Sequence, residues 1–166
     1  MRTLLRTLLP ALALFHAGAA LATHDAQWPA VPSRLQLDTP YGQLHVSASD
    51  YVYESYLMLD DQRIEPEVKG LLNIPYAFSA ANFHVALVSV DTGSKNCPVH
   101  YTWIMLNETG YTATPPFGSC TDQIRVDTTP EGFTMLTPSV EHDDKLDKYL
   151  YDGKVVTVDT VPAPKS

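Results

Sequence analysis

Turn residues divide this chain into short runs in which apolar and polar side chains alternate. Arg34–Asp38 alternates in this way, and after a turn at Pro40–Gly42 the run Leu44–Ala48 does so again. A period of two is typical of a strand that is buried on one face. Similar runs follow along the chain, and no helical pattern lies between them. We therefore predict one all-β domain, an antiparallel sandwich or small barrel of about nine short strands with one disulfide.

Two of the runs are apolar almost without interruption. Phe83–Val90 is broken only by His84 and Ser89, and Val99–Leu106 is the second such run. Continuous apolar runs of this length are typical of central strands that are buried on both faces. The predicted core therefore contains Phe83, Val85, Leu87, Val88, Val90, Trp103 and Ile104.

Turn chemistry predicts two hairpins. Asn107–Gly110 places Asn at the first turn position and Gly where a positive φ is needed. Asp152–Gly153 lies between two strand-like runs and is a strong signal for a closing hairpin. Glu65–Asn82 contains Pro66, Gly70 and Pro75, so we expect it to be the least regular stretch, with room for one short helix at most.

The run Tyr51–Leu59 fits both the spacing of a strand and that of a helix. Its aromatic residues and the turn-forming Asp60–Gln62 that follows favour a strand. Gln123–Val126 and Gly132–Leu136 are predicted as further short strands.

The first 22 residues have the three parts of an export signal. Arg2 and Arg6 precede an apolar run over Leu8–Leu14, and Ala20–Ala22 is the small-x-small triplet that signal peptidase accepts. The run is interrupted by Pro10 and is shorter than the roughly 20 apolar residues of a membrane span. We predict cleavage after this triplet, a periplasmic or secreted mature protein, and no membrane span after cleavage.

Removal of 22 of the 166 residues leaves 144, which is the size of one ordinary domain. We predict a signal peptide at 1–22, a flexible segment at 23–33, the all-β domain at 34–160 and a mobile tail at 161–166.

The balance of charge is acidic. The chain has 11 basic and 19 acidic residues, and the loss of Arg2 and Arg6 with the signal changes the formal charge from −8 to −10. Proteins that bind nucleic acid use basic surfaces, so we expect no nucleic-acid partner. An acidic surface attracts a basic protein over long range.

The chain has two cysteines, Cys97 and Cys120. An even number in an exported protein predicts a disulfide, and the C-x-x-C motif of redox proteins is absent. An even loop at Asn107–Gly110 would set Cys97 opposite Cys120 and Ile104 opposite Ala113. A bulge at the glycine would shift this register by one residue, and the residues leave both registers open.

We find no constellation of catalytic or metal-binding residues in the sequence. The histidines do not lie at metal-ligand spacing, and His84 and His100 fall in strands that we expect to be buried. The acidic cluster Glu141–Asp144 fits a solvated loop, and Ser119 lacks the nucleophile elbow of hydrolases. We therefore predict no catalytic residue, no metal and no cofactor.

Tyrosines are the remaining signal, because seven of them fall on predicted strands. Most are explained by cross-strand packing. Tyr149 and Tyr151 lie on one face of the closing hairpin, away from the most apolar strands, and tyrosine is enriched at binding surfaces. We predict these two as an interface.

Three segments together form a recognisable pattern. They are Cys97-Pro98-Val99-His100-Tyr101, Phe117-Gly118-Ser119-Cys120 and Tyr149-Leu150-Tyr151-Asp152-Gly153-Lys154. This C-P-x-x-Y, F-G-x-C and Y-x-Y-D-G-K pattern resembles that of uncharacterised small exported bacterial β proteins. The resemblance implies an architecture over residues 83–157 and no activity.

These observations favour an exported soluble binding protein, with an inhibitor or immunity-type protein that acts on a basic cell-envelope enzyme as the most concrete form. One alternative is a small envelope hydrolase whose His and Asp residues are distant in the sequence. Another is a structural subunit of the envelope. An enzyme would show a concave pocket that holds at least two histidines or acids within hydrogen-bond reach.

Overall fold

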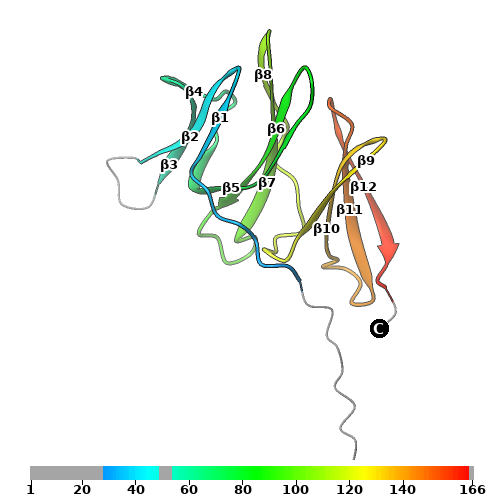
Figure 1. Cartoon of the computed structure of the whole chain (residues 1–166). Helices are drawn as coiled ribbons and strands as arrows, with labels where there is room; N and C mark the ends of the chain where they lie inside the picture. Colours follow the sequence, from blue (N-terminus) through cyan, green and yellow to red (C-terminus); the bar gives the residue numbers. More distant parts are fainter. Residues whose placement is uncertain (1–27, 49–53, 165–166) are drawn as a thin grey trace, which may run out of the picture.

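The computed structural model describes residues 28–48 and 54–164, which form twelve strands and no helix (Figure 1). The predicted signal peptide at 1–22 and residues 51–53 of the predicted Tyr51–Leu59 strand lie outside these ranges. None of the described residues belongs to a helix that could cross a membrane. The strands are β1 Gln36–Thr39, β2 Gly42–Ala48, β3 Ser55–Leu59, β4 Gln62–Arg63, β5 Lys69–Ser79, β6 His84–Asp91, β7 Val99–Asn107, β8 Gly110–Ala113, β9 Arg125–Thr129, β10 Gly132–Pro138, β11 Lys145–Tyr151 and β12 Val156–Pro162.

The strands form two antiparallel sheets in three layers. The larger sheet has the order β1-β2-β3-β5-β6-β7-β8, with β4 paired to β3, and the smaller has the order β12-β11-β10-β9. The larger sheet folds over at the short junction of β3 with β5, so that β1–β4 cover one face of β5–β8. The smaller sheet covers the opposite face (Figure 1). This arrangement confirms the all-β prediction as an antiparallel sandwich.

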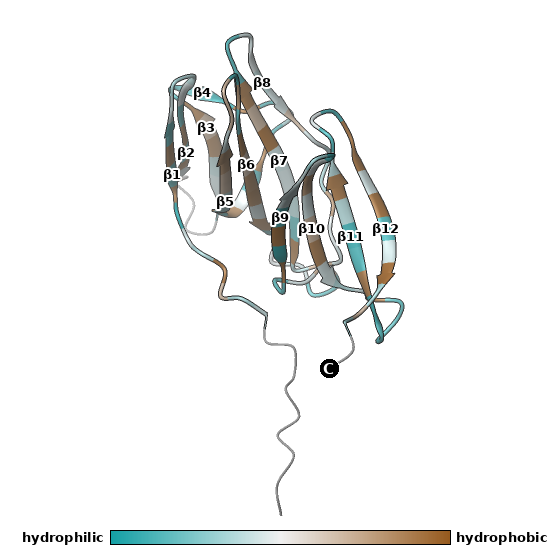
Figure 2. Ribbon diagram, turned by 45° about the vertical axis from the view of Figure 1, so that its right-hand side comes forward, coloured by the Kyte–Doolittle hydropathy of each residue, from teal (hydrophilic) through white to brown (hydrophobic). Residues whose placement is uncertain are grey.

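The middle layer, β5–β8, supplies side chains to two separate cores. The first core lies between this layer and β1–β4, and the second core lies between this layer and the smaller sheet. Along β6, Val85 and Leu87 point toward the smaller sheet, whereas Ala86, Val88 and Val90 point toward β1–β4. Both sets are at most 2 % exposed, and apolar residues run the length of β6 in Figure 2. Burial on both faces is the reason why this strand is not alternating in its sequence.

The predicted core is largely confirmed. Six of its seven residues are buried, and Phe83 is half-buried at the border of the second core. Trp103 is fully buried, and its ring contacts those of Tyr151 and Phe133 at centroid distances of 5.8 and 5.6 Å. The hairpins at Asn107–Gly110 and Asp152–Gly153 are also confirmed.

The prediction for Glu65–Asn82 is wrong, because this stretch contains β5, the longest strand of the described chain. Gly70 has a φ of +143°, and a side chain there would collide with the carbonyl oxygen of Asp91 on β6. Pro75 lies where the pairing of β5 with β6 shifts between Asn73 and Tyr76. Gly70 therefore allows a close contact between the two strands, and Pro75 lies at a bulge.

The register between β7 and its return strand begins as the even loop requires and then shifts. Ile104 faces Ala113, but beyond Pro115-Pro116 the pairing moves by one residue, and Tyr101 faces Phe117. Proline lacks the N–H that a regular ladder needs. Cys120 has a φ of +58°, so it approaches Cys97 from a loop rather than from a strand.

The disulfide between Cys97 and Cys120 is confirmed, with a Cα–Cα distance of 4.6 Å. It ties the start of β7 to the loop that leads from the larger to the smaller sheet. A structural disulfide is typical of proteins in oxidising compartments outside the cytosol. At the other end of the chain, β12 runs to Pro162, and Ala163 N donates to Asp144 O at 3.0 Å.

We predict that Trp103→Ala lowers the free energy of unfolding by about 3–5 kcal/mol, because it empties the centre of the second core. Urea unfolding measures this change. The chain has two tryptophans, so a Trp28→Phe background isolates the fluorescence of Trp103. In that background iodide should not quench the folded protein, and free quenching would contradict the burial of Trp103.

We predict that replacing both cysteines, Cys97→Ala with Cys120→Ala, lowers the free energy of unfolding by about 2–4 kcal/mol. The bridge closes a loop with a sequence separation of 23 residues. Without the bond, the unfolded chain regains the conformational entropy of this loop, and this favours unfolding. The double replacement avoids an unpaired thiol. Recovery of two free thiols by non-reducing peptide mapping of the unmodified protein would contradict the disulfide.

Candidate functional site: an aromatic cleft with an acidic rim

The structure places the two predicted interface tyrosines in the second core. Tyr149 is 9 % exposed and Tyr151 is 1 % exposed. The ring of Tyr151 is stacked on Trp103, and that of Tyr149 lies 5.4 Å from Phe117. Burial raises the pKa of both phenols. Their placement therefore corrects the interface prediction: both are packing residues and do not form a surface patch.

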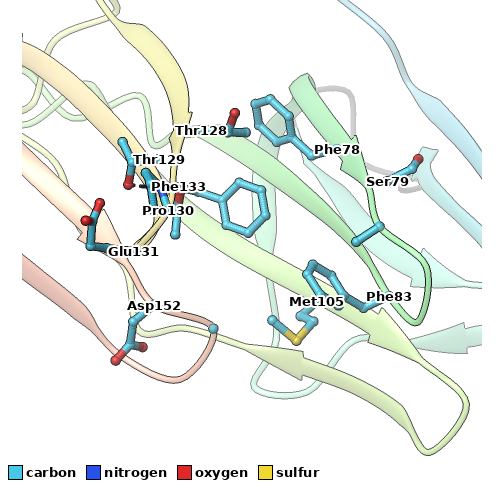
Figure 3. A pocket seen from close by; sticks show the side chains of 13 residues that line it. Phe78, Ser79, Phe83, Met105, Thr128, Thr129, Pro130, Glu131, Phe133 and Asp152 are labelled. Atoms are coloured by element: carbon cyan, nitrogen blue, oxygen red, sulfur yellow. Dashed lines mark hydrogen bonds between the residues drawn. The ribbon is translucent and has the colours of Figure 1, made fainter.

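A cleft lies at one end of this core, between the two sheets. Its volume is about 540 Å³, within the range of sites for small ligands or anchoring side chains. It is formed by the β5–β6 turn, by β7, by the β9–β10 hairpin and by the β11–β12 hairpin (Figure 3). The lining residues are Phe78, Ser79, Ala80, Phe83, Met105, Thr128, Thr129, Pro130, Glu131, Gly132, Phe133, Asp152 and Gly153.

The floor of the cleft is aromatic. Phe133 is its centre, with Phe78 at a centroid distance of 5.2 Å and Phe83 at 6.4 Å in an edge-on arrangement. Figure 3 shows Met105 beside Phe83 on the same side of the cleft. All four side chains are half-buried, so part of each apolar surface faces the cleft. Such a floor binds an apolar group and excludes water from it.

The rim of the cleft is acidic. Glu131 and Asp152 lie on the side of the smaller sheet, opposite Phe83 and Met105 (Figure 3). A hydrogen bond from the side chain of Thr129 and the backbone N–H of Glu131 itself lower the pKa of the Glu131 carboxyl. Two exposed carboxylates therefore flank one side of an apolar cleft.

The second carboxylate is held by its own turn. Asp152 Oδ1 accepts hydrogen bonds from the backbone N–H groups of Val155 at 2.9 Å and Lys154 at 2.8 Å. These bonds lower the pKa of the Asp152 carboxyl. The carboxyl groups of both acidic residues consequently remain ionised at neutral pH.

A glycine brings the two hairpins together. Gly132 has a φ of +147°, and a side chain at this position would collide with the backbone carbonyl of Tyr151. The start of β10 thus approaches the end of β11 closely enough to set Glu131 and Asp152 on the same rim. Only glycine combines this φ with this contact.

The histidines within the described ranges do not form a catalytic group. His45 Nε2 lies 2.9 Å from Asp60 O, and His84 Nδ1 lies 3.1 Å from Ser79 Oγ, so both have local partners. Burial lowers the pKa of His100, as expected of a histidine packed in the neutral form. Within residues 28–48 and 54–164, no three His, Cys, Asp or Glu side chains form a group that could hold a metal ion.

A polar network lies beneath the disulfide, and it joins the loop to the smaller sheet. Ser119 Oγ donates to Asp147 Oδ2 at 2.6 Å and accepts from Thr137 Oγ1 at 2.9 Å. The hydroxyl of Tyr149 lies 2.9 Å from the same oxygen. Ser119 is buried and all its hydrogen-bonding capacity is used, so the network is a structural clamp rather than a nucleophile.

Comparisons of the chain with protein-family models, with curated proteins and with solved structures find no match.

The sequence contained signals for the parts of the cleft but not for their assembly. Pro130–Gly132 and Asp152–Gly153 are turn sequences that carry an acidic residue each, and Phe83 and Met105 fall on predicted strands or beside them. Nothing in the sequence indicates that the two turns meet. That meeting depends on the pairing of β10 with β11 and on the packing of the two sheets.

We predict that Ser119→Ala lowers the free energy of unfolding by about 1–3 kcal/mol, because it leaves the Asp147 carboxylate and the Thr137 hydroxyl without their shared partner. Thermal or urea unfolding measures the change. The matched control is Ser94→Ala at an exposed position, which should change stability by about 0.5 kcal/mol or less. Equal stability of the two variants would contradict the clamp.

Proposed function

We propose that this chain is an exported binding protein that captures a basic protein of the cell envelope. In this proposal the cleft between the sheets receives a lysine or arginine side chain of the partner. The observation that carries it is the combination of an aromatic floor with two ionised carboxylates on one rim. An inhibitor or immunity-type protein that acts on a basic enzyme is the most concrete form.

Both parts of a lysine or arginine side chain, its stem and its cationic head, match the chemistry of the cleft. The methylene stem of lysine or arginine is apolar and packs well on aromatic rings. Its cationic head is attracted by the face of Phe133 or Phe83 and by a carboxylate. Glu131 and Asp152 supply that carboxylate from the rim. A neutral apolar ligand would use the floor and leave the rim without a role.

The state of the carboxyl groups favours binding over hydrolysis. A pair of carboxyl groups that acts in acid-base catalysis needs one member with a raised pKa, so that it carries a proton at neutral pH. Here the pKa values of both Glu131 and Asp152 are lowered. The cleft also contains no histidine. It therefore presents negative charge rather than a proton donor.

The charge of the whole chain supports the same partner. A formal charge of −8, or −10 after loss of the signal, attracts a basic protein over distances longer than any contact. The cleft would then hold one side chain of that protein after the encounter. Long-range attraction and the cleft contribute to different rate constants, so kinetics can separate them.

The test begins with capture of the partner from an envelope extract by the mature protein. The captured protein is then studied by stopped flow with three variants: Glu131→Gln, Phe83→Ala and, as the matched control, Glu108→Gln. Glu108 is an exposed acidic residue in the β7–β8 turn and is not a cleft residue. Its replacement removes the same charge from a place where the proposal assigns it no contact.

We predict that Phe83→Ala raises the dissociation rate by tenfold or more, the effect of removing a side chain from a binding centre. Glu131→Gln should also raise it, whereas Glu108→Gln should leave it unchanged. The association rate should fall between about 0.05 and 0.3 M salt for every variant, because screening acts on long-range attraction. Unchanged dissociation rates for Phe83→Ala and Glu131→Gln would show that the cleft is not the binding site.

A further inference from the structure

The smaller sheet ends in an edge strand that is unusually long for this molecule. β12 has seven residues and pairs with β11 without a bulge along its whole length. The other edge strands of the two sheets, β1, β4, β8 and β9, have two to five residues. Proteins commonly shorten, bend or charge such edges to prevent strand pairing. β12 carries a single charged residue, Asp159, and one proline, at its end.

The hydrogen bonds of the β11–β12 ladder show which backbone groups of β12 face outward. Asp152 N donates to Val155 O, and Ala163 N donates to Asp144 O. Bonded residue pairs alternate along an antiparallel ladder, so the odd-numbered residues of β12 bond to β11. The N–H and C=O groups of Val156, Val158 and Thr160 therefore point away from the sheet. The Thr160 N–H donates to Asp159 Oδ1 at 2.9 Å, whereas those of Val156 and Val158 lie along the open edge.

The side chains along this edge are apolar and exposed. Val155 is 55 % exposed and Val158 is 63 % exposed, two of the most exposed large apolar residues among those described. A groove of about 300 Å³ runs beside them, with Pro116 and Phe117 on its far wall. Outward backbone groups next to an apolar groove are the two requirements for the addition of a strand.

We propose that two copies of this chain pair through β12, in an antiparallel arrangement whose two-fold axis passes at Val158. The outward backbone groups allow axes at several residues of β12, because a two-fold axis in an antiparallel pair sets one residue opposite its own copy, and the side chains select Val158 among them. With Val158 opposite Val158 of the second copy, Val156 lies opposite Thr160. The four-stranded sheets of the two copies then become one continuous eight-stranded sheet across the axis.

The side chains of β12 are complementary to themselves in this register. Val155 lies opposite Val161 of the second copy, so the exposed valines gain apolar partners. Thr157 lies opposite Asp159, which places a hydroxyl donor against a carboxylate. No two like charges face each other. Centres at Val156 or Thr160 would leave Val155 without an apolar partner. A centre at Thr157 would set Val155 opposite Asp159, and a centre at Asp159 would set two carboxylates against each other.

Amide hydrogen exchange followed by NMR tests the pairing on the unmodified mature protein. The amides of Val156 and Val158 should exchange rapidly at about 10 µM and become protected at about 1 mM, since dimer formation depends on concentration. The amides of Thr157 and Asp159 are bonded within each copy and should be protected at both concentrations. Outward amides that exchange equally fast at both concentrations overturn the proposal.

Sedimentation of two matched lysine variants supplies the second test. Val158→Lys sets two lysines against each other at the axis and should raise the dimer dissociation constant by tenfold or more. Thr157→Lys adds the same charge but faces Asp159 of the second copy, so it should leave the dimer intact or strengthen it. Both positions are exposed, so the variants should fold normally. Equal effects of the two variants, or a monomer at every concentration, overturn the proposal.

Salt separates this result from a failure of the proposed function. Each copy carries a net negative charge, so screening should strengthen self-association. The capture of a basic partner should respond to salt in the opposite direction. The dimer experiments use no partner and change no residue of the cleft.

Discussion

The structure depends on the burial of β6 and β7 on both faces. The apolar side chains of these strands alternate between the two cores, so neither face can be left to solvent. One sheet cannot cover both faces unless it folds over, which the larger sheet does at the short β3–β5 junction. This fold covers only one face of β6 and β7. The four-stranded sheet covers the other, and its packing on Trp103 creates the cleft at its border.

The segment that connects the middle layer to the smaller sheet is held by three independent interactions. Thr114 Oγ1 accepts the backbone N–H of Trp103 at 3.0 Å, at the point where the two prolines end regular pairing. The disulfide follows at Cys120, and the buried Ser119 bonds to Asp147 of β11. The first two fix the loop to β7 and to its start, and the third fixes it to β11. The smaller sheet therefore takes a defined position over β7, on which the width of the cleft depends.

The sequence predicts elements whose local pattern and burial agree, and fails where tertiary contacts override the pattern. β6, β7 and both hairpin turns follow from apolar runs and turn residues. β5 does not, because Gly70 and Pro75 are breakers in an isolated strand but meet specific needs in this sheet. The period of two places Tyr149 and Tyr151 on one face, yet it contains no information on which face another sheet covers. The cleft combines residues from four distant segments, and the sequence offers no signal for their meeting.

The two proposed surfaces use different parts of the smaller sheet, and this separation has a consequence for binding. None of the cleft residues belongs to β12, so pairing of two copies through that strand uses none of them. A paired molecule would carry two acidic clefts in a fixed relation. A partner with two cationic anchors at matching spacing would then bind by avidity, since the second contact forms at a high effective concentration. A partner with one anchor would gain nothing from pairing. The edge strand would in this way set which basic proteins are held tightly, while each cleft sets how one side chain is recognised.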